Sequence, residues 1–238
     1  MDGLHLCGPR PELRNAADSR TSLSILESRF REPLIANVRQ NMTMSVQQFA
    51  THYYLRENGP FRSLSDLPAG SEDPIFLDLL TRHKRELGYR RRYGKDYIRI
   101  RRRVEDQLRE LFIARGGNPR RRHPFYLVYG ESAWFRDLNA NQDEVRIPLS
   151  DLDPETTSVT FPDSFIALSR HDKPYYNQVF LIGEVSEIVE RFGVPANDHL
   201  VPYERYWETD FELYIEIPLW DTPPKFLNAE LSDAADSR

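Results

Sequence analysis

The sequence contains a single cysteine, Cys7, among 238 residues. One cysteine can form neither an internal disulfide nor a cysteine-based zinc site, and this scarcity is typical of proteins of the reducing cytosol. No apolar run approaches the length of a membrane span, and the first residues lack a cationic segment followed by an apolar one. The sequence therefore predicts a cytoplasmic protein that neither crosses a membrane nor carries a secretory signal.

Motifs for several common chemistries are also missing. The chain has no glycine-rich phosphate loop, no serine elbow and no pair of histidines at metal-ligand spacing. Its six histidines are scattered along the sequence. We therefore expect no bound metal.

Charge is distributed unevenly. The segment from Arg82 to Arg122 holds sixteen Lys and Arg and five Asp and Glu, a net charge of +11, so the rest must carry −16 to give the total of −5. Clustered arginine is typical of surfaces that bind nucleic-acid phosphates, but it also suits a basic helical layer that lies against an acidic sheet. For the first alternative, the candidate contacts to DNA or RNA are Arg91, Arg92, Arg99, Arg102 and Arg103.

Length and composition favour one domain with two tails. With 39% hydrophobic residues the chain can bury one substantial core. Residues 1–41 and 227–238 are rich in polar residues, and we expect them to be disordered on either side of a single domain at 42–226. Met42 and Met44 stand where the ordered pattern begins and are candidate start positions.

Helical patterns dominate the first half of the expected domain. Ser45 can cap a short helix through Ala50, and an aromatic strand is expected at Thr51 to Arg56. Asp73 and Pro74 are typical of a helix start, and the helix is expected to continue until Gly88. A second helix is expected from Lys95 to Ala114, with its arginines outward and an apolar stripe of Tyr97, Ile100, Val104, Leu108, Leu111 and Phe112.

Strand patterns dominate the second half. Runs of aromatic and β-branched residues predict strands at His123 to Tyr129, Glu144 to Leu149, Ser158 to Phe161, Val179 to Ile182 and Asp210 to Trp220, with a helix from Gly183 to Phe192. Few elements alternate as strand, helix and strand, which favours the α+β class. We expect a helical N-terminal half whose Arg-rich helix packs on a mixed, mostly antiparallel sheet from the C-terminal half.

Polar residues at every second strand position are the candidates for chemistry. His52 and Tyr54 share a strand face, as do Ser158 and Thr160. Glu216 stands out because Ile215 and Ile217 flank it, and a buried carboxylate requires a partner or a function. The alternative is that this strand has one face toward solvent.

Several segments together resemble a family of bacterial proteins that has no assigned activity. The resemblance covers roughly residues 45 to 225 and implies domain boundaries without a mechanism. The segments that carry it are His52 to Tyr54, Gly59 to Leu67, Phe112 to Pro119, His123 to Glu131, Val159 to Phe165 and Tyr214 to Trp220.

The order of elements is also similar to the ADP-ribosyltransferase fold, particularly to DarT-type enzymes that modify DNA. The similar parts are a His-containing strand with a helical turn at His52 to Leu67, a hydroxyl-bearing strand at Ser158 to Thr160, and a late strand with Glu216 before Pro218. In the first half the sequence departs from that pattern, because Arg-rich helices fill the spacing.

This second resemblance implies cleavage of NAD and modification of a nucleic acid. It implies Glu216 and His52 as catalytic residues, because a fixed carboxylate can stabilise an oxocarbenium-like transition state. The residues that it implies around NAD are Arg62, Tyr54, Tyr129, Ser158 and Thr160. A transferase would bring His52, Ser158 and Glu216 to one concave pocket.

Two other classes of function fit the same sequence. A nucleic-acid-binding module without catalysis would use the arginines and tyrosines and would not need Glu216. A protein-interaction domain would need neither set.

Overall fold

The structure is a computed structural model that describes residues 47–195 and 210–224. The expected disordered segments at 1–41 and 227–238, and the candidate starts at Met42 and Met44, lie outside the described residues. No helix within the described ranges combines the length and the apolar character needed to cross a membrane.

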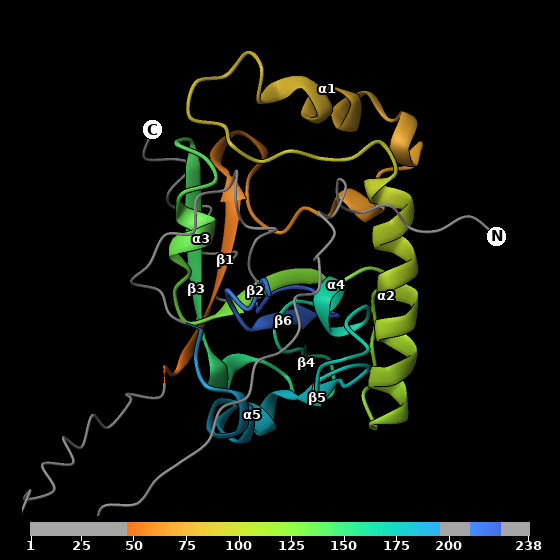
Figure 1. The fold of residues 1–238 in the computed structure, drawn as a ribbon, viewed down its shortest axis with the longest axis vertical. Coiled ribbons are helices and arrows are strands. Elements are labelled where there is room, and N and C mark those ends of the chain that lie inside the picture. The colour runs from red at the N-terminus through yellow and green to blue at the C-terminus, as the bar shows by residue number, and fades with distance from the viewer. Residues whose placement is uncertain (1–46, 196–209, 225–238) are drawn as a thin grey trace, which may run out of the picture. The chain divides into compact units, whose positions relative to one another are not determined.

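The central feature is a four-stranded sheet in which every neighbouring pair is antiparallel. Its order is β3 (Gln142–Pro148), β1 (Phe49–Leu55), β2 (Phe125–Tyr129) and β6 (Glu216–Leu219). The β1–β3 pair crosses the β2–β6 pair at a steep angle in Figure 1, and the two pairs meet where Ala50 and Thr51 lie opposite Tyr129 and Val128. A second antiparallel pair, β4 (Ser158–Val159) and β5 (Phe180–Leu181), is connected to β6 by an isolated bridge between Thr160 and Glu216.

Within the described ranges, five α-helices lie around these strands (Figure 1): α1 (Pro74–Arg82), α2 (Tyr97–Ala114), α3 (Ala133–Arg136), α4 (Ser164–Ala167) and α5 (Val185–Phe192). Short 3₁₀ helices are η1 (Arg56–Asn58), η2 (Leu64–Asp66), η3 (Gly70–Glu72), η4 (Leu149–Asp151) and η5 (Ile182–Glu184). The predicted start of α1 is confirmed, because the Asp73 side chain accepts a hydrogen bond from the Ile75 backbone N–H at 3.0 Å and Pro74 occupies the first turn. That helix ends at Arg82, before the expected Gly88.

Helices together with antiparallel sheets confirm the α+β class. The sheet is not built from the C-terminal half alone, because β1 is one of its two inner strands. The helix expected from Ser45 to Ala50 is wrong over its described part: Phe49 and Ala50 belong to β1, where Ala50 pairs with both Tyr129 and Ile147. Pairing on two sides outweighs the weak local preference for a helix.

The late strand is shorter than expected. Residues 210–215 are not in a strand and Phe211 has a positive φ of 59°, so β6 begins at Glu216. The alternation of Phe211, Leu213, Ile215 and Ile217 predicted a longer strand, but only Ile217 lies within β6.

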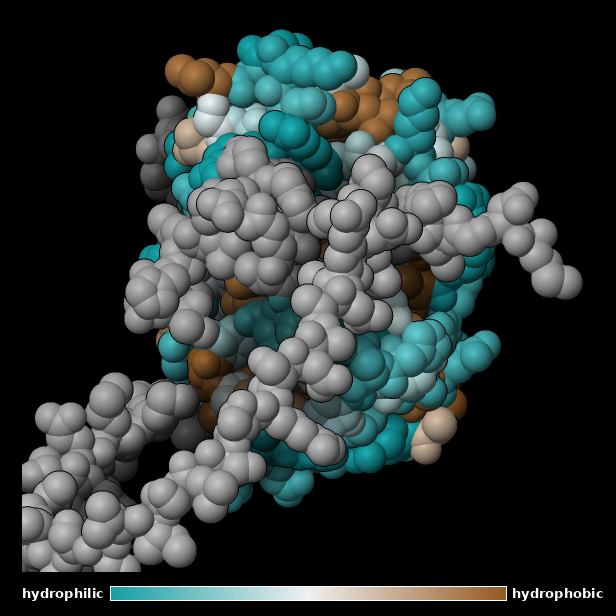
Figure 2. All heavy atoms as spheres, viewed as in Figure 1, coloured by the Kyte–Doolittle hydropathy of each residue, from teal (hydrophilic) through white to brown (hydrophobic). Residues whose placement is uncertain are grey.

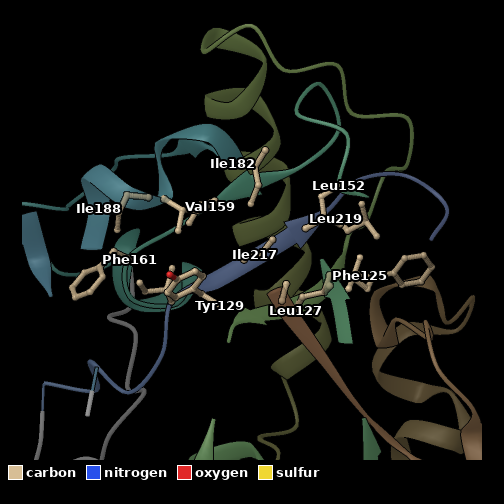
Figure 3. Packing of buried hydrophobic residues seen from close by; sticks show 14 of the residues in the cluster. Phe125, Leu127, Tyr129, Leu152, Val159, Phe161, Ile182, Ile188, Ile217 and Leu219 are labelled. Atoms are coloured by element: carbon tan, nitrogen blue, oxygen red, sulfur yellow. The ribbon is translucent and has the colours of Figure 1, made fainter. Parts of the chain in front are cut away.

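One face of the sheet carries the apolar core (Figure 3). Ala50, Leu127, Ile147 and Ile217 are fully buried there, and Val185 and Ile188 of α5 pack against the same cluster. Because side chains alternate along a strand, Thr51, Tyr126 and Glu216 point to the opposite face. That opposite face is polar.

Helix α2 faces the protein interior with a stripe that differs from the predicted one. Its buried residues are Ile98, Arg101, Glu105, Leu108 and Phe112, at intervals of three and four. Leu108 and Phe112 were expected, and they pack against Val179 and Trp220. Arg101 and Glu105 were not expected, and they place two opposite charges inside the protein.

Candidate functional site

A cluster of buried polar side chains, which we call the polar centre, lies on the polar face of β2 and β6. Its other members come from η2, from α2, from the segment before β2, and from the N-terminus of α4. The polar centre consists of Ser65, Arg101, Glu105, His123, Tyr126, Asp163, Ser164 and Glu216, of which all but Tyr126 are buried.

Arg101 connects the two halves of the polar centre. Its guanidinium forms ion pairs with Glu105 at 3.3 Å and with Glu216 at 3.4 Å, and it donates to the Ser164 hydroxyl at 3.3 Å. The Tyr126 ring lies 3.7 Å from the guanidinium carbon, and the Phe165 ring lies on the guanidinium at 4.7 Å. Planar guanidinium suits this combination of stacking and paired hydrogen bonds better than a lysine would.

Glu105 is fully buried and saturated with donors. Its carboxylate accepts from the Ser65 hydroxyl at 2.9 Å, from the Tyr126 hydroxyl at 3.0 Å and lies 2.7 Å from His123 Nδ1. Burial acts to raise the pKa of Glu105, but the hydrogen bond to His123 and the charge of Arg101 outweigh it, so the pKa lies below its ordinary value. This carboxylate therefore stays charged at neutral pH and holds α2 against β2.

Glu216 points inward from β6 and is 4% exposed. One carboxylate oxygen pairs with Arg101, and the other accepts the Ser164 backbone N–H at 2.9 Å. These two contacts fix its orientation against α4.

Asp163 is a second buried carboxylate beside Glu216. It caps α4 by accepting the Ile166 backbone N–H at 3.0 Å, and the Tyr214 hydroxyl donates to it at 3.5 Å. Burial and then the charge of Glu216 raise the pKa of Asp163 to about 7. A carboxyl group that exchanges its proton near neutral pH next to an ion-paired carboxylate is an arrangement found in acid–base sites.

His52 lies on the other face of the sheet from Glu216. Its strand neighbour Thr51 pairs with Val128, which in turn pairs with Glu216, so alternation directs His52 away from the polar centre. Its Nε2 accepts the Phe61 backbone N–H at 2.9 Å, which leaves Nδ1 to donate to the Tyr126 carbonyl at 2.8 Å. Burial lowers the pKa of His52 to about 4, so the ring is neutral and both nitrogens serve the backbone.

The two predicted hydroxyl residues lie near Glu216 but bond elsewhere. Ser158 accepts the Trp220 indole N–H at 2.9 Å, and the Thr160 hydroxyl donates to the Pro162 carbonyl at 3.3 Å. The Thr160 and Glu216 backbones exchange hydrogen bonds, so Thr160 lies directly beside the carboxylate strand. The structure thus brings Ser158, Thr160 and Glu216 onto one face. The expected convergence of His52, Ser158 and Glu216 on one pocket is wrong for the described residues, because His52 lies on the other face of the sheet.

The other residues expected around NAD are dispersed. Tyr129 is part of the apolar core. Arg62 is exposed. Tyr54 stacks on His52 at 5.9 Å and lines a small recess of about 60 Å³ together with Tyr53, Tyr89, Arg91, Tyr93 and Phe135.

Ring contacts connect this recess to the polar centre. Phe135 on the wall of the recess lies 4.8 Å from the ring of Tyr214, whose hydroxyl donates to Asp163. On another side, Tyr93 contacts Tyr97 at 4.8 Å, and Tyr97 contacts Phe165 at 5.9 Å. A ligand in the recess would therefore be separated from Asp163 by two aromatic rings in succession, Phe135 and Tyr214.

The arginines expected to bind nucleic acid have different environments. Arg102 donates to the Ser65 and Leu67 carbonyls at 3.0 and 2.6 Å, so it holds η2 in place. Arg91 is half-buried over the Tyr93 ring. Arg92, Arg99 and Arg103 are exposed, and Figure 2 shows the outer side of α2 as mainly hydrophilic.

Most of the remaining basic segment is paired with acids from outside it, as the alternative of a basic layer against an acidic region predicts. Arg85 pairs with Asp78, and Arg121 pairs with Asp66 at 2.5 Å. The further arginines with such partners are Arg82, Arg90, Arg115 and Arg120.

Sequence reasoning missed Arg101, Glu105 and Asp163. The first two could have been found by following the helical spacing backward from Leu108 and Phe112, which leads through 105 and 101 to Ile98. Asp163 had a weaker indication, because an Asp that follows Pro162 and precedes a helical turn is a typical N-cap.

The described residues contain no group of three or more His, Cys, Asp or Glu arranged to hold a metal ion. No protein-family model, curated protein or solved structure matches the chain. The fold and the polar centre define an α+β protein with a buried carboxylate pair joined to an arginine.

Proposed function

We propose that the protein is an ADP-ribosyltransferase-like enzyme that cleaves NAD, with Glu216 as the catalytic carboxylate. The observation that supports this proposal is the buried pair of Glu216 and Asp163. Glu216 is oriented by Arg101 and the Ser164 N–H, and Asp163 beside it has a pKa of about 7. Glycosyl transfer uses such a pair of carboxyl groups in two different protonation states.

The two carboxyl groups would have different roles. NAD supplies a bond between ribose and nicotinamide that breaks with its electron pair moving to the ring nitrogen. Glu216 would stabilise the positive charge that develops on the ribose, because a fixed charge in a buried site needs no reorganisation. Asp163 in its ionised form would take the proton from the acceptor oxygen or nitrogen that bonds to the ribose, which balances the reaction.

Side chains outside the polar centre have the chemistry to hold NAD. Tyr54 and Phe135 on the recess could stack on a planar ring, and exposed Arg62 could pair with a pyrophosphate. Both carboxylates are almost closed to solvent, so substrate has to displace the half-buried rings of Tyr214 and Phe165 to reach them. His52 has no part in this proposal, because both of its ring nitrogens are engaged with the backbone.

The test is release of nicotinamide from NAD by the full chain, with and without single-stranded DNA or RNA. We expect wild-type protein to release nicotinamide and Glu216→Gln to be slower by at least about 100-fold, the size of effect seen when one charge-stabilising group is removed from an active site. Glu110→Gln on the exposed side of α2 is the matched control and should keep wild-type activity.

Urea unfolding of both variants shows whether each is folded. A folded Glu216→Gln protein as active as wild type would contradict the proposal, as would the absence of nicotinamide release by wild type under every condition.

A second candidate function, nucleic-acid binding, is favoured by a separate observation. Arg92, Arg99 and Arg103 are all exposed, and Arg99 and Arg103 lie four residues apart on α2, about one helical turn. Such a stripe can follow a phosphate backbone, either to bring the acceptor to a transferase or to bind without catalysis.

Fluorescence anisotropy with labelled single-stranded DNA tests this second candidate. We expect the affinity to fall with salt, and the slope of log K against log salt to decrease by roughly 0.7 in Arg99→Gln and in Arg103→Gln, because each variant neutralises one phosphate fewer. Arg146→Gln, an exposed arginine on β3, is the control. Binding that is independent of salt, or equal in all variants, would exclude the stripe as the contact surface.

A further inference from the structure

The loop from His83 to Arg92, between α1 and α2, lines an open surface pocket of about 450 Å³. This loop is drawn in yellow at the upper left of Figure 1. The pocket is separate from the polar centre and shares only Tyr89 with the lining of the aromatic recess. Its volume falls within the range of sites that bind small organic ligands, roughly 300 to 1,000 Å³.

The walls of this loop pocket are held in place by contacts at several points. The Tyr89 backbone bridges to Asn139, and the Arg90 N–H donates to the Leu138 carbonyl at 2.9 Å. Glu86 accepts the Asn141 side-chain amide at 3.1 Å. Gly88 has a φ of +84°, which allows the sharp turn back toward Tyr89. The pocket is therefore preformed, which lowers the entropy cost of binding.

The lining of the loop pocket is strongly cationic. Four basic side chains, Lys84, Arg85, Arg90 and Arg92, line it with a single carboxylate, Glu86. Glu86 is engaged by Arg82, so most of its charge is neutralised at its own site. The pocket thus favours an anion.

The existing partners of Arg85 leave donors for a ligand. Arg85 pairs with Asp78 and donates to the Thr81 hydroxyl at 3.1 Å, and Arg90 pairs with Asp137. These ion pairs are partly or largely exposed and contribute little stability, and the Arg85 guanidinium has five N–H donors, more than its two partners use. Lys84 forms no ion pair with any described residue.

His83 adds an uncompensated polar atom. Its Nδ1 is buried and lacks a hydrogen-bond partner among the described residues. A buried nitrogen without a partner costs free energy, and a ligand oxygen next to it would remove that cost.

From these observations we infer that the loop pocket binds a small phosphorylated molecule of about nucleotide size. Lys84, Arg85, Arg90 and Arg92 would bind its phosphate groups, and His83 would hydrogen-bond to one of its oxygens. This inference does not depend on the proposed transferase reaction, because none of these residues belongs to the polar centre.

Isothermal titration calorimetry of the full chain with ADP at low salt tests the inference. We expect ADP to bind and uncharged adenosine to bind at least about tenfold more weakly. Lys84→Gln and His83→Ala should each weaken ADP binding by about tenfold, the reduction expected for one charge-assisted hydrogen bond. Lys95→Gln removes the same charge outside the pocket and should leave ADP affinity unchanged.

Glu216→Gln separates this site from the proposed active site. If the loop pocket binds ADP, this variant keeps wild-type affinity while Lys84→Gln does not. The inference is overturned if adenosine binds as well as ADP, or if Lys95→Gln weakens binding as much as Lys84→Gln. It is also overturned if Lys84→Gln weakens binding of single-stranded DNA while ADP does not bind, since the cations would then serve a nucleic-acid backbone.

Discussion

Replacement of Arg101 by methionine would remove the cation that joins the two halves of the polar centre. Methionine keeps most of the length of the side chain, so the packing against Tyr126 and Phe165 is disturbed less than by alanine. What disappears is the ion pair with Glu105 at 3.3 Å and the ion pair with Glu216 at 3.4 Å. Both carboxylates would then remain buried without their common partner.

The size of the destabilisation can be worked from these contacts. Removal of one partner from a buried ion pair destabilises a protein by about 3–5 kcal/mol. Arg101 has two carboxylate partners, but Glu105 keeps its hydrogen bonds from Ser65, Tyr126 and His123. Loss of the cation–π interaction with Tyr126 at 3.7 Å adds about 1–2 kcal/mol. We therefore expect the free energy of unfolding to fall by about 4–7 kcal/mol, from the loss of a buried ion pair together with the cation–π interaction.

This destabilisation should depend on pH. Without Arg101, Glu105 loses a positive charge that lowers its pKa, so the folded variant binds a proton at Glu105 more readily than folded wild type does. Its stability relative to wild type then improves as pH falls from 7 toward 4. In wild type the contribution of Glu105 to stability should fall as pH falls, because a carboxylate with a lowered pKa stabilises the folded state only while it is charged.

Urea unfolding of the full chain, followed by circular dichroism at pH 7 and pH 5, measures both effects. The control is Arg103→Met, an exposed arginine two residues further along α2, which should change stability by no more than about 0.5 kcal/mol. The structural reasoning is refuted if Arg101→Met loses less than about 1 kcal/mol, the lower limit for such a buried polar contact. It is equally refuted if the two variants behave alike, or if the difference from wild type does not shrink at pH 5.

Single residues give three further predictions. His52 has a pKa of about 4 in the folded protein and 6.5 in the unfolded chain, so acidification from pH 7 to pH 4 should lower the free energy of unfolding of wild type by roughly 3 kcal/mol through this residue. His52→Gln lacks this contribution, and urea unfolding at several pH values would show it. An equal dependence of stability on pH in the two proteins would contradict the prediction. Asp163, with its pKa raised to about 7, binds a proton on folding, so its contribution to the stability of wild type falls as pH rises from 4 to 7. The stability of Asp163→Asn relative to wild type should therefore be higher at pH 8 than at pH 5. NMR titration of the Asp163 carboxyl group with no midpoint above about 5 would argue against this. An added Cβ at Gly117 would overlap the Phe112 ring, so Gly117→Ala should cost about 1–3 kcal/mol in thermal unfolding, whereas Gly94→Ala, with open space around it, should be nearly neutral.

Local sequence determined several elements because their causes lie within a few residues. Asp73 and Pro74 define the start of α1 through a side-chain cap and a fixed φ. The helix expected to end at Ala114 ends there, and α5 ends at Phe192 before Gly193, as predicted. The α+β class followed from the order of these local patterns.

Strand ends and the sides of strands were decided by tertiary structure. The alternation around Ile215 predicted a strand from Asp210, but β6 begins at Glu216, where β2 and Thr160 provide partners. Register also placed His52 and Glu216 on opposite faces of the sheet, although both are polar residues on strands. A sequence gives the spacing within one strand, whereas the register between strands depends on contacts far apart in the chain.

The identity of the buried charges was likewise a tertiary outcome. On α2, Ile100 and Val104 have the same helical spacing as Arg101 and Glu105, so either pair could belong to the buried side of the helix. Hydrophobicity alone favours burial of Ile100 and Val104. The second pair is inside because Glu216, Ser65, His123 and Tyr126 supply partners from three other segments. The sequence by itself thus determined where helices form and which residue types are available. Only the assembled fold could decide which charges are buried, because a charge is stable inside a protein only when partners from distant parts of the chain surround it.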